Sequence, residues 1–274
     1  MITRPFICDA NMTKHIQTVP PSGAVDLANR LADAARGIVR QYFRTRLEVM
    51  NKQDESPVTI ADRAIELMMR EQIIDAFPDH GIRGEEFAHH QPTADWCWHL
   101  DPIDGTKSFL SGSLCFGTQI ALSYLGKPVM GVIDQPITEE RWLSRNGTET
   151  QINDQVAKTS SCSSLNSAVM YTSDPYIFAG DQIRKFDVLR KSVFLTRYSH
   201  DCYAAGLLAL GQIDLLVETG VYAYDIAAQI PVIEGAGGVI TDWAGNIPQL
   251  ENKGDFLAAA TADLHAQALA TLRA

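Results

Sequence analysis

The chain has 274 residues, of which 46% are hydrophobic and 20% are charged, and its 23 basic and 33 acidic side chains give a net charge of −10. Since a domain holds roughly 100–200 residues, this length predicts one large domain or two tightly packed halves with a sizeable core. Nucleic acid and anionic membrane surfaces would repel this charge, so we expect neither as a partner.

The N-terminal segment lacks the continuous apolar stretch of an export signal. Arg4, Pro5 and Asp9 interrupt any apolar stretch there, and no apolar run approaches the roughly 18 residues of a membrane span. The five cysteines form no CxxC pair, which disfavours a disulfide framework or a thiolate zinc site. We therefore expect a cytoplasmic protein whose cysteines are reduced.

Two helices are predicted first along the chain. Apolar residues recur at helical spacing from Ala24 to Tyr42. A second helix starts near Thr59 or Asp62, either of which could cap it, and ends at Phe77 because Pro78 follows.

The middle of the chain predicts strands. Three short apolar segments cover 96–100, 116–124 and 128–134, and 81–83 is a fourth candidate. The stretch from Leu125 to Pro128 has the composition of a hairpin turn, so this part of the sheet is predicted to be antiparallel.

Beyond about residue 150 the pattern changes to an alternation of strands and helices. The predicted strands are 168–171, 193–196, 213–217 and 238–242, and the predicted helices are 179–189, 202–210, 225–235 and one from Asp263. Such alternation indicates an α/β half in which helices cover a sheet.

Two carboxylates, Asp101 and Asp104, flank the turn after the strand at 96–100. Pro102 is expected to end that strand at Asp101, and Gly105 allows close approach of a ligand. If a helix begins at Asp104 or Gly105, the free amides of Gly105 and Thr106 form an anion site. Oxygen ligands of this kind suit Mg²⁺ or Mn²⁺, although Asp-Pro and Asp-Gly are also common turn dipeptides.

Further acidic residues add to this pattern. Glu85 and Glu86 follow Gly84, and Asp225 opens the predicted helix at 225–235. Taken singly, Glu85 is also consistent with a surface charge and Asp225 with a helix N-cap.

Together these segments resemble the inositol monophosphatase family of metal-dependent phosphatases. The resemblance rests on WHLDPIDGTKSF (98–109), YDIAAQIPVIEGAGG (224–238), GEE (84–86) and PVTIAD (57–62), in order across about residues 24–245. It implies a fold of the α/β (α+β) class, in which helices and sheets stack as a layered α/β/α/β/α sandwich. It also implies an N-terminal extension (1–21), an N-terminal half with an antiparallel sheet (22–148) and a C-terminal α/β half (149–274). Homodimers are usual in the family, so the resemblance implies a homodimer.

The resemblance also implies the site residues. The implied metal ligands are Glu85, Asp101, the carbonyl of Ile103, Asp104 and Asp225. The amides of Gly105 and Thr106 would hold the phosphate, and Lys52 would lie beside a third metal. Glu86 is either a supporting residue or simply solvated.

The implied reaction is hydrolysis of a phosphate monoester by direct attack of a metal-activated water. Two or three Mg²⁺ ions would neutralise the charges that repel a nucleophile, with Mn²⁺ as a substitute. Asp62 and Thr106 would orient the water and Glu85 would hold its cation, so these three are the implied catalytic residues.

The segments around Asp225 resemble the histidinol-phosphatase branch of the family, which cleaves L-histidinol phosphate in histidine biosynthesis. Tyr224 stands where the family usually has Trp, and RYSHDCY (197–203) replaces a small-residue stretch. Arg197, Asp201 and Glu218 are the candidate substrate contacts, with Glu218 matching the family's substrate-contacting acid. The carboxylates of Asp201 and Glu218 would suit a cationic substrate.

Three alternatives remain open from sequence. Asp201 could instead cap the helix at 202–210 and pair with Arg197. The substrate could be inositol 1-phosphate or a sugar phosphate, since the catalytic motifs are shared. A non-catalytic interaction protein on the same fold is disfavoured because every matched metal ligand is present.

Overall fold

The computed structural model describes residues 18–46, 50–51 and 57–274. Lys52 and most of the 1–21 extension lie outside the described residues. Within the described part, strands form a seven-stranded sheet of order β3-β4-β5-β6-β7-β8-β9, a five-stranded sheet of order β11-β10-β12-β14-β13 and a two-stranded ladder β1-β2.

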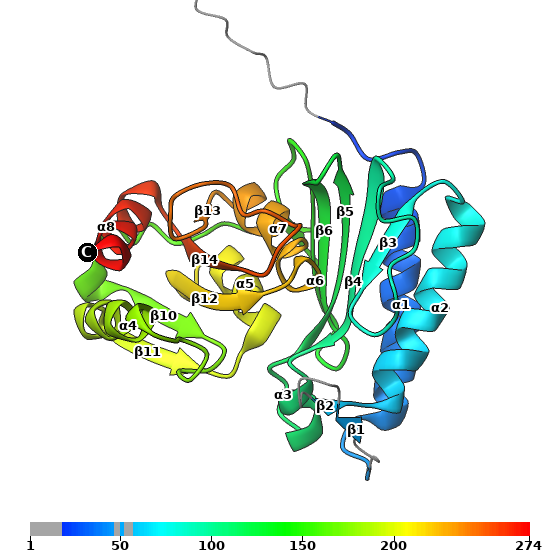
Figure 1. Cartoon of the computed structure of the whole chain (residues 1–274), viewed down its shortest axis with the longest axis horizontal. Helices are drawn as coiled ribbons and strands as arrows, with labels where there is room; N and C mark the ends of the chain where they lie inside the picture. The colour runs from blue at the N-terminus through cyan, green and yellow to red at the C-terminus, as the bar shows by residue number, and fades with distance from the viewer. Residues whose placement is uncertain (1–17, 47–49, 52–56) are drawn as a thin grey trace, which may run out of the picture.

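The strands and helices alternate in five layers (Figure 1). The strands are β1 (Met50–Asn51), β2 (Pro57–Val58), β3 (Gly81–Gly84), β4 (Trp96–Asp104), β5 (Gly117–Tyr124), β6 (Lys127–Gln135), β7 (Glu140–Arg145), β8 (Gln151–Ile152), β9 (Gln155–Val156), β10 (Val169–Thr172), β11 (Leu195–Tyr198), β12 (Leu215–Val221), β13 (Val239–Thr241) and β14 (Gly254–Ala259). The helices are α1 (Ala24–Tyr42), α2 (Ile60–Ala76), α3 (Thr106–Ser111), α4 (Asp181–Ser192), α5 (Asp201–Ala209), α6 (Ala223–Ile226), α7 (Gln229–Gly235) and α8 (Ala262–Arg273), with a 3₁₀ turn at Leu165–Ser167.

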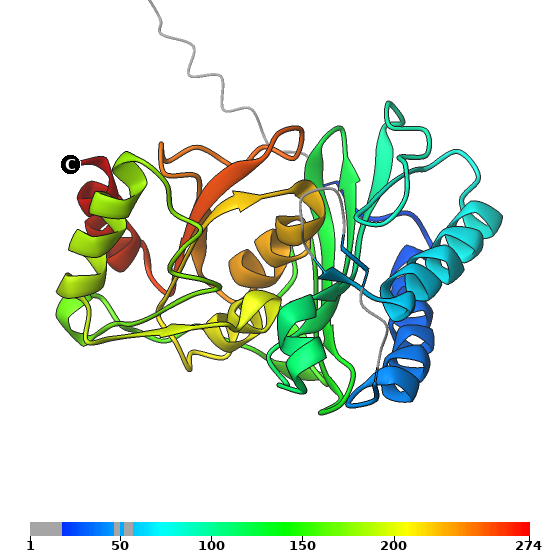
Figure 2. The ribbon, with the colours of Figure 1, turned by 60° about the horizontal axis from the view of Figure 1, so that its bottom comes forward.

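Apolar burial explains the layering. Helices α1 and α2 bury one face against the larger sheet, with Leu31, Ile65 and Trp98 in that core. Helices α5 and α7 pack between the two sheets, where Trp142 and Phe256 belong to one shared core. Helices α4 and α8 lie side by side on the outer face of the smaller sheet (Figure 2). The α/β/α/β/α sandwich expected from the sequence is confirmed.

The sheets differ in strand direction. In the larger one β5 and β6 form the predicted antiparallel hairpin, with Tyr124 opposite Lys127, whereas the edge pair β3–β4 is parallel. In the smaller one β10 pairs in parallel with β11 and β12, and β14 is antiparallel to β12 and β13.

The prediction that Pro102 ends the strand at Asp101 is wrong. Strand β4 continues to Asp104, and its register against β5 shifts between Asp101 and Asp104. Proline is tolerated at such an irregularity because no ladder hydrogen bond is required from its missing N–H. The Pro102 carbonyl is used instead, accepting the Thr118 hydroxyl at 2.8 Å.

The predicted helix at 225–235 is two helices. Helix α6 begins at Ala223, two residues before the expected start, and α7 begins at Gln229. Pro231 has no N–H to donate to the Ala227 carbonyl four residues back, which accounts for the break. Asp225 therefore lies in the first turn of α6 and is not its N-cap.

Candidate metal centre and active site

Three aspartates meet where the two sheets face each other. Asp101 and Asp104 come from the end of β4, and Asp225 comes from α6. Each offers one carboxylate oxygen, and these three oxygens all lie within 4.8 Å of one another. Three of the sequence-predicted ligands, from segments far apart in the chain, are thus brought together.

Asp101 is the most deeply buried of the three, with 1% of its surface exposed. Burial raises its pKa well above the usual range, and the carboxylates of Glu85, Asp104 and Asp225 raise it further. Among the described residues its Oδ1 has no hydrogen-bond partner. A buried acceptor in a cluster of like charges fits a divalent cation, which would satisfy the oxygen and remove the repulsion.

Asp104 is held by protein donors from two directions. Its Oδ2 accepts the backbone N–H of Cys202 at 2.6 Å and Nε2 of Gln119 at 3.0 Å. Burial and the carboxylates of Asp201 and Asp225 raise its pKa well above the ordinary value.

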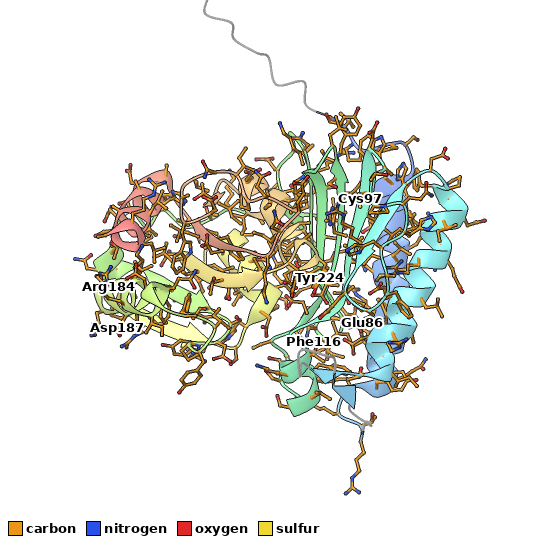
Figure 3. All side chains as sticks on the ribbon, in the orientation of Figure 1. Glu86, Cys97, Phe116, Arg184, Asp187 and Tyr224 are labelled. Carbon is orange, nitrogen blue, oxygen red and sulfur yellow. The ribbon has the colours of Figure 1, made fainter. Side chains whose placement is uncertain are left out.

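Asp225 is fixed by the start of its own helix. Its Oδ2 accepts the backbone N–H of Tyr222 at 2.6 Å. The preceding Tyr224 lies between the two sheets (Figure 3), and its pKa is raised by burial and then by Asp225, Glu85 and Asp101. The tyrosine that replaces the usual Trp is therefore close to the cluster.

A buried carboxylate on α2 anchors the segment that carries Glu85. Glu66 accepts the backbone N–H of Glu86 at 2.7 Å and Nε of Arg70 at 2.7 Å. A Cβ at Gly84 would lie 2.0 Å from Glu66 Oε1, so any larger residue there would displace Glu66 from these hydrogen bonds. This contact ties Glu86 to α2 through its backbone, and its half-buried position makes plain solvation an incomplete description.

Asp62 lies in the first turn of α2, where Thr59 is the N-cap. Its Oδ2 accepts the Thr59 backbone N–H at 2.8 Å, and among the described residues its buried Oδ1 has no hydrogen-bond partner. Burial raises its pKa to about 6, with a contribution from Glu85. A carboxylate with this pKa can gain or lose a proton near neutral pH.

The turn after β4 has the close approach that the sequence predicts. Gly105 has φ +88°, and a Cβ there would lie 2.8 Å from Asp201 Oδ2. Thr106 begins α3, and its hydroxyl donates to the Ile103 carbonyl at 3.1 Å. That carbonyl is the expected metal ligand, and its second lone pair is compatible with a cation.

Two cavities adjoin the cluster and share Ser173, Ile177 and Asp201. The first, of ≈ 370 Å³, is also lined by Glu85, Gly105 and Thr106. The second, of ≈ 210 Å³, is also lined by Asp104, Glu218, Asp225 and Gln229. A larger cavity of ≈ 680 Å³ lies beside α1 and β7, but its Arg36 and Arg141 are paired with buried Asp134, so the chemistry assigns the site to the two smaller cavities.

The candidate substrate residues divide into two groups. Glu218 is 7% exposed, accepts the Ser173 N–H at 2.5 Å and hydroxyl at 2.7 Å, and has its pKa raised to about 8 by burial. Burial likewise raises the pKa of Asp201 to about 6. Arg197 is exposed on β11 and lines neither cavity, and among the described residues it makes no ion pair with Asp201. Asp201 is the first residue of α5 rather than its cap.

Sequence reasoning missed Ser173 and Gln119. Ser173 lies just beyond the carboxyl end of β10, which pairs in parallel with two neighbours. Ligands bind at such ends in open α/β sheets, so this position was a usable signal. Gln119 lies within a strand and carries no motif.

The fold and the site define the class of protein: a layered α/β protein with a cluster of three aspartates between its sheets that could hold a metal ion. The model of the inositol monophosphatase family matches residues 23–274. The chain belongs to that family, and it is a phosphate monoester hydrolase by class. No helix in the described part of the chain is long and apolar enough to cross a membrane.

Three known proteins show how this chain compares with members of the family. The chain is 44% identical to the bifunctional phosphatase IMPL2 of Arabidopsis thaliana, a chloroplastic protein, over 90% of this chain and 74% of the relative. It is 35% identical to a histidinol-phosphatase of Chlorobaculum parvum, over 84% of this chain and 90% of the relative. The solved structure of an inositol monophosphatase from Zymomonas mobilis is 41% identical in sequence, with a TM-score of 0.85. The match covers 93% of this chain and 100% of that one.

Proposed function

We propose that this chain hydrolyses L-histidinol phosphate to L-histidinol and phosphate, with Mg²⁺ as its cation. The observation that carries this proposal is a pair of carboxylates, half-buried Asp201 and buried Glu218, in cavities that adjoin the aspartate cluster. A substrate with an ammonium and an imidazole can pair with these side chains in their deprotonated form, whereas a neutral polyol offers them no opposite charge. The histidinol-phosphatase relatives support the same choice.

Glu85, Asp101, Asp104, Asp225 and the Ile103 carbonyl would hold the cations. Bound divalent cations supply charge neutralisation at the phosphoryl oxygens and lower the pKa of water. Asp62, whose pKa of about 6 is close to neutral, would accept the proton of the attacking water, and Thr106 would help to orient that water. The amides of Gly105 and Thr106 would orient the phosphate, and Asp201 and Glu218 would orient the leaving group.

Inositol 1-phosphate is the second candidate substrate, favoured by the similarity to the Zymomonas mobilis structure. We expect kcat/KM for L-histidinol phosphate to exceed that for myo-inositol 1-phosphate by at least about tenfold, with Mg²⁺ and side-by-side phosphate-release assays. A preference of that size corresponds to one charge-assisted hydrogen bond. The reverse order would establish the inositol alternative, and no turnover of either ester would favour a non-catalytic role.

Replacing Glu218 with glutamine is expected to raise KM for L-histidinol phosphate about tenfold or more and to leave KM for inositol 1-phosphate nearly unchanged. Glu218 is mostly protonated in the empty site below pH 8, so pairing with a cation requires it to release a proton. KM should therefore fall in the wild type as pH rises from 6 to 8.

The pH profile of the Glu218→Gln variant isolates this effect, because the substrate's own titrations are common to both proteins. An equal rise in KM for both esters would mean that Glu218 serves general packing instead.

We also propose a homodimer, as is usual in the family. Edge strand β11 exposes Leu195, and the neighbouring Phe194 is 68% exposed. Sedimentation equilibrium of the wild type and of a Phe194→Glu variant would test this assignment. A wild type that is monomeric at micromolar concentration would contradict it.

A further inference from the structure

A buried glutamine connects two of the cluster aspartates. Gln119 lies in the middle of β5, and its side chain is fully buried. Its Nε2 donates to Asp104 Oδ2 at 3.0 Å and to the backbone oxygen of Asp225 at 2.9 Å. One amide nitrogen thus contacts a residue at the end of β4 and a residue in α6, which are far apart in the chain.

A second glutamine supports the same carbonyl. Gln229, at the start of α7, is 4% exposed and donates from Nε2 to the Asp225 backbone oxygen at 2.6 Å. Two side-chain amides therefore donate to this oxygen, one from the larger sheet and one from a helix between the sheets.

These glutamines have a cost for folding. Within the described residues, Oε1 of Gln119 and Oε1 of Gln229 are buried without a hydrogen-bond partner. A buried acceptor that loses water and gains no donor destabilises the folded state, and an apolar side chain of equal length would avoid that penalty. Fold stability therefore does not account for two glutamines here.

An uncharged donor does suit a cation site. Lysine or arginine at position 119 could also bridge the two aspartates, but its positive charge would compete with a metal ion for the same carboxylates. An amide orients the carboxylate of Asp104 and leaves its negative charge available. Hydrogen bonds that other residues donate to metal ligands orient those ligands and tune the affinity of the site for its metal.

We propose that Gln119 is a positioning residue of the metal centre. It holds Asp104 and Asp225 at the spacing that a shared divalent cation requires, and Gln229 assists at Asp225. This inference rests on the proposed metal-dependent function.

The test is cation binding measured without substrate. Gln119→Met keeps the length of the side chain and removes its donors. By isothermal titration calorimetry and electron paramagnetic resonance, we expect the Kd for Mn²⁺ to rise about tenfold to a hundredfold. The thermal midpoint of the metal-free protein should be unchanged or higher, which a purely structural role would not produce. Gln229→Met should weaken Mn²⁺ less, because Gln229 contacts only Asp225.

Ser123→Ala is the matched control. Ser123 is buried on the same strand and its hydroxyl bonds His99 Nε2 at 2.9 Å and the Cys97 carbonyl at 3.2 Å, remote from the cluster. This variant should bind Mn²⁺ as the wild type does. Equal Mn²⁺ affinity in Gln119→Met and wild type overturns the inference, and so does a lowered thermal midpoint with unchanged affinity. A wild type that binds no Mn²⁺ overturns the metal-dependent function itself. If Gln119→Met does not fold, Gln119→Leu decides by the same measurements.

Discussion

Asp104→Asn and Asp225→Asn are each expected to lower kcat/KM at least about a thousandfold while the protein remains folded. In both side chains Oδ2 accepts a backbone N–H, from Cys202 and from Tyr222. An asparagine must keep its oxygen at those donors, which turns its NH₂ group toward the cation. Losing several kcal/mol of charge stabilisation reduces the rate about tenfold for each 1.36 kcal/mol.

Phosphate release and far-ultraviolet circular dichroism measure these two quantities. Asp255→Asn is the matched control, because Asp255 is also a partly buried carboxylate that accepts a backbone N–H, from Trp243 at 2.8 Å, but lies on β14 away from the cluster. It should retain activity. An Asp104→Asn or Asp225→Asn enzyme with wild-type kcat/KM would contradict the assignment of the metal ligands.

The metal-free protein is expected to lose stability as the pH rises from 7 to 9. Glu218, with a pKa of about 8, and Asp101 and Asp104, with pKa values raised well above the usual range, hold protons in the folded state that the unfolded chain has already released. The folded state then binds more protons than the unfolded state, so stability falls with rising pH through the folded pKa values. The thermal midpoint should fall by several degrees, at about 2–4 °C per kcal/mol for a chain of this size.

Buried histidines such as His99 have lowered pKa values and have the opposite effect below about pH 6.5, the ordinary histidine pKa. Differential scanning calorimetry at pH 7, 8 and 9 avoids that range. Saturating Mg²⁺ should raise the midpoint more at pH 9 than at pH 7, since the ligands must be deprotonated to bind it. Glu218→Gln should reduce the slope in the absence of metal. A midpoint that stays constant or rises from pH 7 to 9 would contradict the cluster's electrostatics.

The net charge of −10 has a clearer meaning with the site in view. Four of the 33 acidic residues are the expected carboxylate ligands Glu85, Asp101, Asp104 and Asp225. When all four are deprotonated they carry −4, which two Mg²⁺ ions would cancel. In that deprotonated form the cluster would repel a phosphate ester without cations, so the acidic composition is consistent with an obligatory cation.

The sequence by itself determined the features that depend on neighbours along the chain. Helical spacing was enough for α1, whose predicted and observed bounds are both Ala24–Tyr42, because one apolar face of a long helix is visible in a single window. The hairpin between β5 and β6 and the turn at Gly105 are likewise local. Strand β14 was missed because its residues include an alanine-rich run and its pairing partners are distant in the chain.

Only the tertiary structure decided which residues meet between the sheets. Asp225 reaches the β4 aspartates because α6 packs against the larger sheet. Gln119 and Glu218 enter the site from separate strands and Ser173 from the end of β10. Arg197, from the motif that also contains Asp201, lies outside it. The physical reason is that strand order, the break before α7 and the irregularity at Pro102 set side-chain directions through long-range packing, which the spacing of residues along the chain does not encode.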